Sequence, residues 1–347
     1  MTKISVVIPS YNHRHFIEKA VDSVLSQSER DLELIIIDDG STDDSLSYLR
    51  QISDSRVKLV EQKNSGAHNA INRGLELAQG EYLAILNSDD IFHPDRLKLC
   101  IQALERDNAD LVATWIEVID SDGKPLGVKE AWRNMLPWAV PEVEKSFSAI
   151  DDFALNLIVS NFVSTTSNIL FTRKLYNEIG GMRNLRFAHD WDFMFRAAEV
   201  SKCIVLSEAL MQYRIHGNNT ISSNRAWMLF EICWVMATGM RRFERNLLYI
   251  GAGVENWLVD VHRIHHSVNL QGNDKVYWMI HQFISSQEAR GVVEPELILL
   301  DSAELRAGFI EYIVTEQPLA AVVSAPEIQK MSLFSLLKIW LKQYIKK

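Results

Sequence analysis

Residues 33–45 read ELIIIDDGSTDDS, so a continuous apolar run ends abruptly in acidic and small polar residues. An apolar run of this length, rich in β-branched residues, predicts a strand buried on both faces, as in the middle of a parallel sheet. Residues 4–12, ISVVIPSYN, and residues 82–90, YLAILNSDD, repeat the pattern. Segments with the 3.6-residue period of helices, at 16–25 and 67–78, separate these runs. The alternation predicts an α/β fold with a mainly parallel sheet flanked by helices.

Composition restricts the class of protein. The chain has 347 residues, 47% of them hydrophobic, with 36 Lys and Arg against 45 Asp and Glu and a formal charge of −9. These values predict a soluble globular protein of about two domains. The acidic balance argues against nucleic-acid binding, because neutralising phosphates requires a basic face. Three cysteines without CxxC spacing give no indication of a disulfide framework or a thiolate zinc site, and they fit a reducing cytosol. We therefore expect a cytoplasmic protein without a membrane-spanning helix.

Polar clusters follow three of the predicted strands, at residues 10–12, 38–41 and 88–90. Ligands of open parallel sheets bind beyond the carboxyl ends of the strands, so this convergence indicates a nucleotide site. Tyr11 could lie against a base, and Asp39 could accept a hydrogen bond from a base N–H such as the imide of uracil. The alternative is that the second cluster only caps the following helix.

Asp89 and Asp90 form an acidic pair at the end of the strand at 82–86. Adjacent carboxylates repel each other unless a cation or protons intervene. Mg²⁺ or Mn²⁺ is the natural partner, held by one or two carboxylates together with substrate phosphates. The alternative is again capping, by Asp90 or Asp95, of a helix that Pro94 would open at its first position.

Five blocks occur in a characteristic order and spacing: ISVVIPSYN, ELIIIDDGSTDDS, NSGAHNAINRGLELAQGEYLAILNSDD, HDWDFMFR and YRIHGNN. Over residues 3–222 the sequence resembles the inverting glycosyltransferases of family 2, which have the GT-A fold. The resemblance implies that Pro9, Tyr11 and Asp39 hold the donor nucleoside, with Asp39 on the base. It also implies that Asp89 contacts the ribose or the sugar and that Asp90 ligates the metal bridging the diphosphate.

The last two blocks carry the remaining functions that the resemblance implies. Asp190 matches the general base of the family, Arg214 matches a residue placed at the diphosphate, and His216 matches one at the metal. Two positions depart from the family pattern, since Asn87 and His189 replace acidic residues. A protonated His189 would lower the pKa of Asp190 and weaken it as a base. Alternatively, His189 faces the acceptor.

The last residues, 331–347, have a separate amphipathic pattern. Leucines, Trp340 and Tyr344 fall on one helical face and lysines on the other, which suits the surface of an anionic bilayer. The alternative is a terminal helix docked on the protein itself. If the helix binds a membrane, the protein is peripheral on the cytoplasmic face, and a lipid-linked saccharide is the favoured acceptor.

The sequence as a whole predicts a GT-A domain at 1–222 and a helical C-terminal region at 223–347, with a loop at 132–150 arching over the site. The predicted function is inverting, metal-dependent transfer of a sugar from a nucleotide-sugar to an acceptor hydroxyl, with a lipid-linked or surface polysaccharide precursor as the expected acceptor. A UDP-sugar is the favoured donor, and a dTDP-sugar stays open because uracil and thymine share the imide edge. Two alternatives remain, a sugar-phosphate nucleotidyltransferase and a donor-binding scaffold without activity. The first would carry a Gly-rich phosphate loop, which residues 10–13 do not provide.

Overall fold

Strands and helices alternate through the first part of the chain, as predicted. The computed structural model describes residues 3–134, 152–217, 224–247 and 273–316. Within these residues one sheet of nine strands forms. The strands are β1 (Ile4–Ser10), β2 (Leu32–Asp38), β3 (Val57–Glu61), β4 (Tyr82–Ile85), β5 (Ile91–Phe92), β6 (Leu111–Ile119), β7 (Pro125–Lys129), β8 (Ile169–Thr172) and β9 (Cys203–Arg214).

The strand order is β3-β2-β1-β4-β8-β6-β9-β5, and β7 pairs with β6 outside this path. Strand β1 runs parallel to both β2 and β4, and β2 runs parallel to β3. Strand β8 is antiparallel to its neighbours β4 and β6, whereas β6 and β9 are parallel. The predicted strands at 4–8, 32–37 and 82–86 are confirmed, and the carboxyl ends of β1, β2 and β4 lie at one edge of the sheet.

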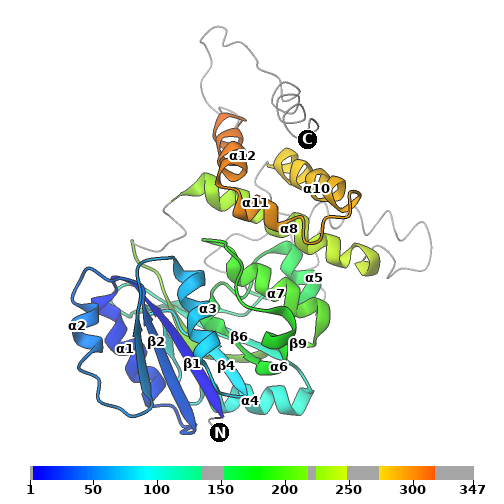
Figure 1. The fold of residues 1–347 in the computed structure, drawn as a ribbon. Coiled ribbons are helices and arrows are strands. Elements are labelled where there is room, and N and C mark those ends of the chain that lie inside the picture. Colours follow the sequence, from blue (N-terminus) through cyan, green and yellow to red (C-terminus); the bar gives the residue numbers. More distant parts are fainter. Residues whose placement is uncertain (1–2, 135–151, 218–223, 248–272, 317–347) are drawn as a thin grey trace. The chain divides into compact units, whose positions relative to one another are not determined.

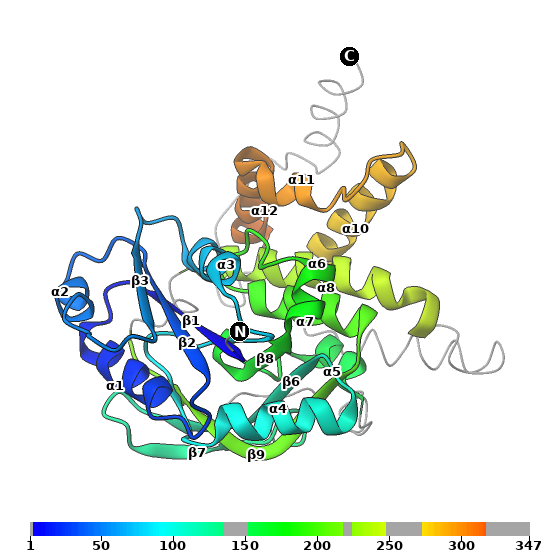
Figure 2. The same ribbon diagram turned by 60° about the horizontal axis from the view of Figure 1, so that its bottom comes forward.

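Helices cover both faces of the sheet (Figures 1 and 2). Along β1, Val6 packs into the apolar cluster that contains α1 and α4, whereas Val7 packs into the cluster that contains α3, α5 and α7. Because successive side chains point to opposite faces, both must be apolar, which explains the continuous apolar runs. The helices are α1 (Arg14–Leu25), α2 (Ser45–Leu49), α3 (Ala67–Leu77), α4 (Arg96–Asp107), α5 (Phe153–Val159), η3 (Thr166–Asn168, a 3-10 helix), α6 (Arg173–Ile179), α7 (His189–Val200), α8 (Arg225–Leu247), α10 (Asp274–Glu288), α11 (Leu297–Asp301) and α12 (Ala303–Glu316).

The helices after the sheet pack through α8. This helix contacts both α7 and α10, and the indole N–H of Trp234 in α8 donates to the carbonyl of Glu296 at 3.0 Å. Met1–Thr315 form one compact unit. None of the described helices is long and apolar enough to cross a membrane.

Several predictions fall on residues outside the described part of the chain. They are the domain boundary near Ser222, most of the loop at 132–150 and the amphipathic helix at 331–347. The division into domains at 1–222 and 223–347 therefore stays a prediction, as does the membrane-binding role of the last segment.

Two details of the fold differ from the predictions. Helix α4 begins at Arg96 and not at Pro94, because Asp95 occupies the N-cap with a non-helical ψ of 5°. Asp95 makes no side-chain capping bond. Strand β9 was not predicted, because several of its twelve side chains are partly or fully exposed and give no continuous apolar run. It matters for the site, since it pairs with β6 and leads directly to His216.

Gly80→Ala is expected to destabilise the sheet, because a Cβ there would lie 2.5 Å from the backbone N of Ser5. The backbone N–H of Gly80 also donates to Ser5 Oγ at 2.8 Å, so the two segments are held together. Overpacking of this kind costs about 1–3 kcal/mol, which urea denaturation would show as a lower midpoint. Gly308→Ala is the control, since a Cβ there meets nothing within 4 Å. Equal midpoints for the two variants would contradict the prediction.

Candidate active site

The polar residues after β1 and β2 meet at one edge of the sheet. The N–H of Asp39 donates to the carbonyl of Ser10 at 2.8 Å, and Asn12 Oδ1 accepts from the N–H of Thr42 at 2.7 Å. Asn12 adopts a φ of 55°, in the left-handed region, directly after Tyr11. Because Tyr11 is 45% exposed, its ring is accessible to a ligand.

The carboxylate of Asp39 is buried and holds the loop before α3. Its Oδ1 accepts from Gln62 Nε2 at 2.8 Å and from the N–H of Ser65 at 2.9 Å, and its Oδ2 accepts from the N–H of Gly66 at 2.9 Å. The alternative in which Asp39 caps the following helix is not observed, since Asp44 occupies the N-cap of α2.

Next to Asp39, at the ends of β1 and β2, two buried side-chain oxygens have no hydrogen-bond partner among the described residues. They are Ser10 Oγ and Asp38 Oδ2, which belong to register neighbours in β1 and β2. Pro9 is buried one position earlier, opposite Ile37. Buried polar groups are normally paired. The carboxyl ends of β1 and β2 therefore have hydrogen-bonding groups left for a ligand.

Asp89 and His216 face each other after the ends of β4 and β9. His216 Nε2 lies 2.9 Å from Asp89 Oδ2, and with His13 they form a group whose potential ligand atoms all lie within 4.8 Å of one another. Burial opposes the charge of Asp89, yet its hydrogen bond with His216 and the nearby His13 lower its pKa. Burial also lowers the pKa of His13, so its imidazole is neutral at pH 7, the form that binds metals.

Asp90 points into the interior. Its Oδ2 accepts from Ser167 Oγ at 2.6 Å, and its Oδ1 accepts from the N–H of Arg214 at 3.1 Å. Burial and the neighbouring Asp89 raise the pKa of Asp90 well above its usual value. The structure thus brings Asp89, and not Asp90, to His216.

Asn87 connects the end of β4 to η3. Its Nδ2 donates to Thr165 Oγ1 at 2.9 Å, and its Oδ1 accepts from Thr166 Oγ1 at 3.0 Å. An ionised carboxylate could not donate the first of these bonds. The departure from the family pattern at Asn87 therefore has a local structural role.

The guanidinium of Arg214 holds the backbone around the acidic pair. Its Nε donates to the carbonyl of Asp89 at 3.0 Å, and its Nη1 donates to the carbonyls of Asp120 and Ser121, both at 3.1 Å. The group also lies 5.0 Å from the ring centroid of Phe16. Arg214 is therefore beside the predicted diphosphate site, and its contact with the diphosphate stays a prediction.

Asp190 lies in the first turn of α7, as predicted, and is 5% exposed. Its Oδ2 accepts from Asn161 Nδ2 at 3.0 Å, and its Oδ1 accepts from the N–H of Trp191 at 2.7 Å. Each carboxylate oxygen can accept a second hydrogen bond, so the group is fixed in place and can still take a proton.

The hydroxyl of Tyr213, at the end of β9, responds to the charge of three carboxylates. Burial raises the pKa of its hydroxyl, and the charges of Asp90, Asp89 and Asp190 raise it further. All three carboxylates therefore act on one side chain at the end of β9. The segment 161–167 links the acidic pair to the first turn of α7, because Asn161 donates to Asp190 and Ser167 donates to Asp90.

Two further titratable groups flank Asp190. Lys129, buried in β7, donates to Ser164 Oγ and lies 3.5 Å from the carbonyl of Asn161. Burial lowers the pKa of Lys129 to about 7, while the charge of Asp190 raises it. Burial likewise lowers the pKa of His189, so this imidazole is neutral at pH 7. The structure gives no support for a cationic His189 that would weaken Asp190.

Sequence reasoning missed three residues of the site: His13, Asn161 and Lys129. A signal existed for His13, which directly follows the polar cluster at the carboxyl end of β1. The other two gave none, since they reach Asp190 only through long-range packing.

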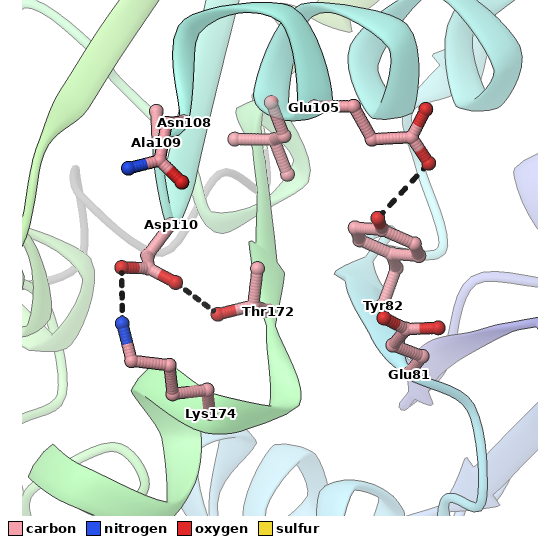
Figure 3. Close-up of a pocket in the computed structure, with 9 residues that line it drawn as sticks. Glu81, Tyr82, Glu105, Asn108, Ala109, Asp110, Thr172 and Lys174 are labelled. Atoms are coloured by element: carbon pink, nitrogen blue, oxygen red, sulfur yellow. Dashed lines mark hydrogen bonds and ion pairs between the residues drawn. The ribbon is translucent and has the colours of Figure 1, made fainter.

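A pocket of about 320 Å³ opens elsewhere (Figure 3). It lies where β4 begins and β8 ends. Asp89 follows the opposite, carboxyl end of β4, so the pocket and Asp89 lie at opposite ends of this strand. Five of its polar side chains are paired with one another: Tyr82 donates to Glu105 at 3.1 Å, and Thr172 and Lys174 donate to Asp110 at 2.8 and 3.1 Å. The pocket is therefore not part of the candidate active site.

Comparison with known proteins identifies the family. The model of glycosyl transferase family 2 matches residues 5–180, half of the chain. TuaG of Bacillus subtilis, named as a teichuronic acid biosynthesis glycosyltransferase, is 31% identical over 247 residues, which cover 70% of this chain and 89% of that protein. Chondroitin synthase of Escherichia coli is 31% identical over 221 residues, covering 62% of this chain but 29% of that protein. The chain belongs to glycosyl transferase family 2 and is a glycosyltransferase.

Solved structures agree on the fold. TarS 1–349 of Staphylococcus aureus, in complex with UDP-GlcNAc, has a TM-score of 0.52 at 18% identity, covering 84% of this chain and 93% of that one. A mannosyltransferase of Pyrobaculum calidifontis, in complex with GDP-Man and Mn²⁺, has a TM-score of 0.50 at 15% identity, covering 90% and 86%. The predicted GT-A type fold is confirmed.

Proposed function

We propose that this glycosyltransferase moves a sugar from a nucleotide-sugar to an acceptor hydroxyl with inversion, and that a divalent metal assists departure of the nucleoside diphosphate. The observation that carries the proposal is the segment 161–167, which contacts both parts of the site: Asn161 donates to Asp190 at 3.0 Å and Ser167 donates to Asp90 at 2.6 Å. It supports a metal site and a base within one site, as a displacement at the anomeric carbon requires.

The donor nucleoside would bind at the ends of β1 and β2. The accessible ring of Tyr11 and the unpartnered atoms of Ser10 and Asp38 support this placement. Asp39 Oδ2 accepts one hydrogen bond among the described residues, so it can accept a second from the imide of uracil. The complex of TarS with UDP-GlcNAc is consistent with UDP as the nucleotide.

The metal would be held by Asp89, His216 and His13. In this proposal Asp89 takes the ligand role that the sequence assigned to Asp90. One carboxylate and two imidazoles suit Mn²⁺ better than Mg²⁺, which prefers oxygen ligands. When bound, the cation would supply positive charge to the leaving diphosphate.

Residues of this chain would act as the base, orient that base and stabilise the charge of the leaving group. Asp190 would accept the proton of the acceptor hydroxyl as that oxygen attacks the anomeric carbon. Asn161 would hold the carboxylate in orientation during the transfer. Arg214 would support the turn that carries Asp89 and add positive charge near the diphosphate.

A saccharide or a lipid-linked saccharide is the proposed acceptor. The names of two relatives, which refer to teichuronic acid biosynthesis and chondroitin synthesis, support a role in polysaccharide biosynthesis. The basic amphipathic segment at 331–347 supports reversible binding to the cytoplasmic face of an anionic membrane.

A panel of nucleotide-sugars with Mn²⁺ or Mg²⁺ tests the proposal, with release of free nucleoside diphosphate as the measurement. We expect UDP release from a UDP-sugar, faster with Mn²⁺ than with Mg²⁺ and abolished by a chelator. Release of pyrophosphate from a sugar phosphate and UTP would instead indicate a nucleotidyltransferase. Binding of UDP without turnover of any donor or acceptor would indicate a scaffold.

A further inference from the structure

Glu231 of α8 accepts three successive backbone N–H groups with one carboxylate. The donors are Arg186 at 2.8 Å, Phe187 at 2.7 Å and Ala188 at 3.1 Å. Glu231 is 1% exposed. A buried carboxylate is costly unless it is hydrogen-bonded, and these three donors compensate for its burial. The arrangement therefore fixes the backbone of residues 186–188.

The three N–H groups lie at the start of the helix that carries Asp190. Ala188 is the N-cap of α7, and no side chain of its own caps the helix. The amino end of a helix has unpaired N–H groups and a partial positive charge, so a carboxylate placed there stabilises it. Glu231 supplies that carboxylate from a different helix, two residues before Asp190.

Arg183 and Arg186, in or near the same segment, also contact residues that follow β9 in the sequence. Arg183 lies 3.3 Å from both Glu294 and Glu296, and the guanidinium of Arg186 lies 5.6 Å from the ring centroid of Trp227 in α8. All these partners come after residue 180, where the match to the family model ends. The helices beyond the family match thus set the position of the segment that leads to Asp190.

We propose that Glu231 is a positioning residue for sugar transfer: it sets the backbone at 186–188 and thereby aims the Asp190 carboxylate at the acceptor hydroxyl. The proposal rests on the function proposed above, in which Asp190 is the base. In this proposal, α8 of the helical region after residue 222 contributes to catalysis by orienting Asp190.

Glu231→Gln in the full chain tests the proposal. Glutamine has the same shape but one acceptor oxygen, so it cannot accept all three N–H groups. We expect kcat for transfer to fall at least ~10-fold, because small misplacement of a reacting group costs about 10²-fold. The Kd for UDP and the KM for the donor should stay within about twofold, and amide hydrogen exchange at 186–188 should become faster.

Val235→Ala is the matched control, one turn further along α8 and fully buried. It loses apolar packing in the same helix without touching the three N–H groups. We expect a similar loss of stability with kcat close to the parent. An equal fall of kcat in both variants would show that Glu231 only stabilises α8, and this would overturn the proposal.

Glu231→Asp provides a second test if the glutamine variant folds poorly. It keeps the charge but is shorter by one methylene, so we expect an intermediate kcat with unchanged affinity for UDP. Parental kcat despite faster amide exchange at 186–188 would overturn the positioning role. Failure of the underlying function would be seen separately, as normal transfer by Asp190→Asn.

Discussion

Asp190→Asn is expected to reduce sugar transfer at least ~10²-fold while leaving UDP affinity nearly unchanged. The asparagine can still accept from the N–H of Trp191, so the first turn of α7 keeps its geometry. It cannot accept a proton at neutral pH, and loss of a general base typically costs about 10²–10⁴-fold. The measurement is the rate of UDP release with donor and acceptor, beside UDP binding by calorimetry.

Glu199→Gln is the control for this experiment. Glu199 is exposed near the other end of the same helix, so removing its charge should leave transfer at the parental rate. If Asp190→Asn also transferred at that rate while folded, Asp190 would not be the base.

Asp89→Asn is expected to weaken Mn²⁺-dependent UDP binding strongly, whereas Asp90→Asn should retain it. Asp89 lies 2.9 Å from His216 and within the potential ligand group, while Asp90 accepts hydrogen bonds from Ser167 and Arg214 inside the protein. Loss of an outer-shell partner of a metal already costs about 10–100-fold, so loss of a direct ligand should cost at least ~10-fold in affinity.

The pair of variants separates two assignments of the metal ligand. UDP titrations with Mn²⁺ and with chelator would be compared for each folded variant. The opposite pattern, with Asp90→Asn impaired and Asp89→Asn normal, would restore the ligand assignment suggested by the sequence. If both variants bound UDP with the parental Mn²⁺-dependent affinity, neither Asp89 nor Asp90 would be a metal ligand.

The sequence predicted the parts of the fold in which burial is continuous along the chain. The apolar runs at 32–37 and 82–86 could only be strands covered on both faces, and the structure places them so. The polar residues that end these strands were predicted to share one edge, because parallel strands end together. The same argument predicted that Asp39 and Asp89 lie beyond the carboxyl ends of β2 and β4, and the structure has them there.

Which of two adjacent carboxylates faces inward could not be read from the pattern. The orientation of Asp89 and Asp90 depends on Ser167 and Arg214, which are 77 and 124 residues away from Asp90 in sequence. The sequence also did not indicate Asn161, Lys129 or Glu231. Each of them acts through a contact between distant segments, and the local spacing of apolar residues carries no information about such contacts. Sequence periodicity reports one element at a time.

Strand β9 lies beyond the part of the chain that the family model matches. The match to the family model ends at residue 180, yet β9 (Cys203–Arg214) lies inside the sheet, between β6 and β5. A fragment ending at residue 180 would expose the side of β6 that β9 pairs, leaving an open row of N–H and C=O groups prone to aggregation. Any exchange of segments between relatives must therefore carry residues 181–217 together with residues 5–180, so that the sheet stays complete.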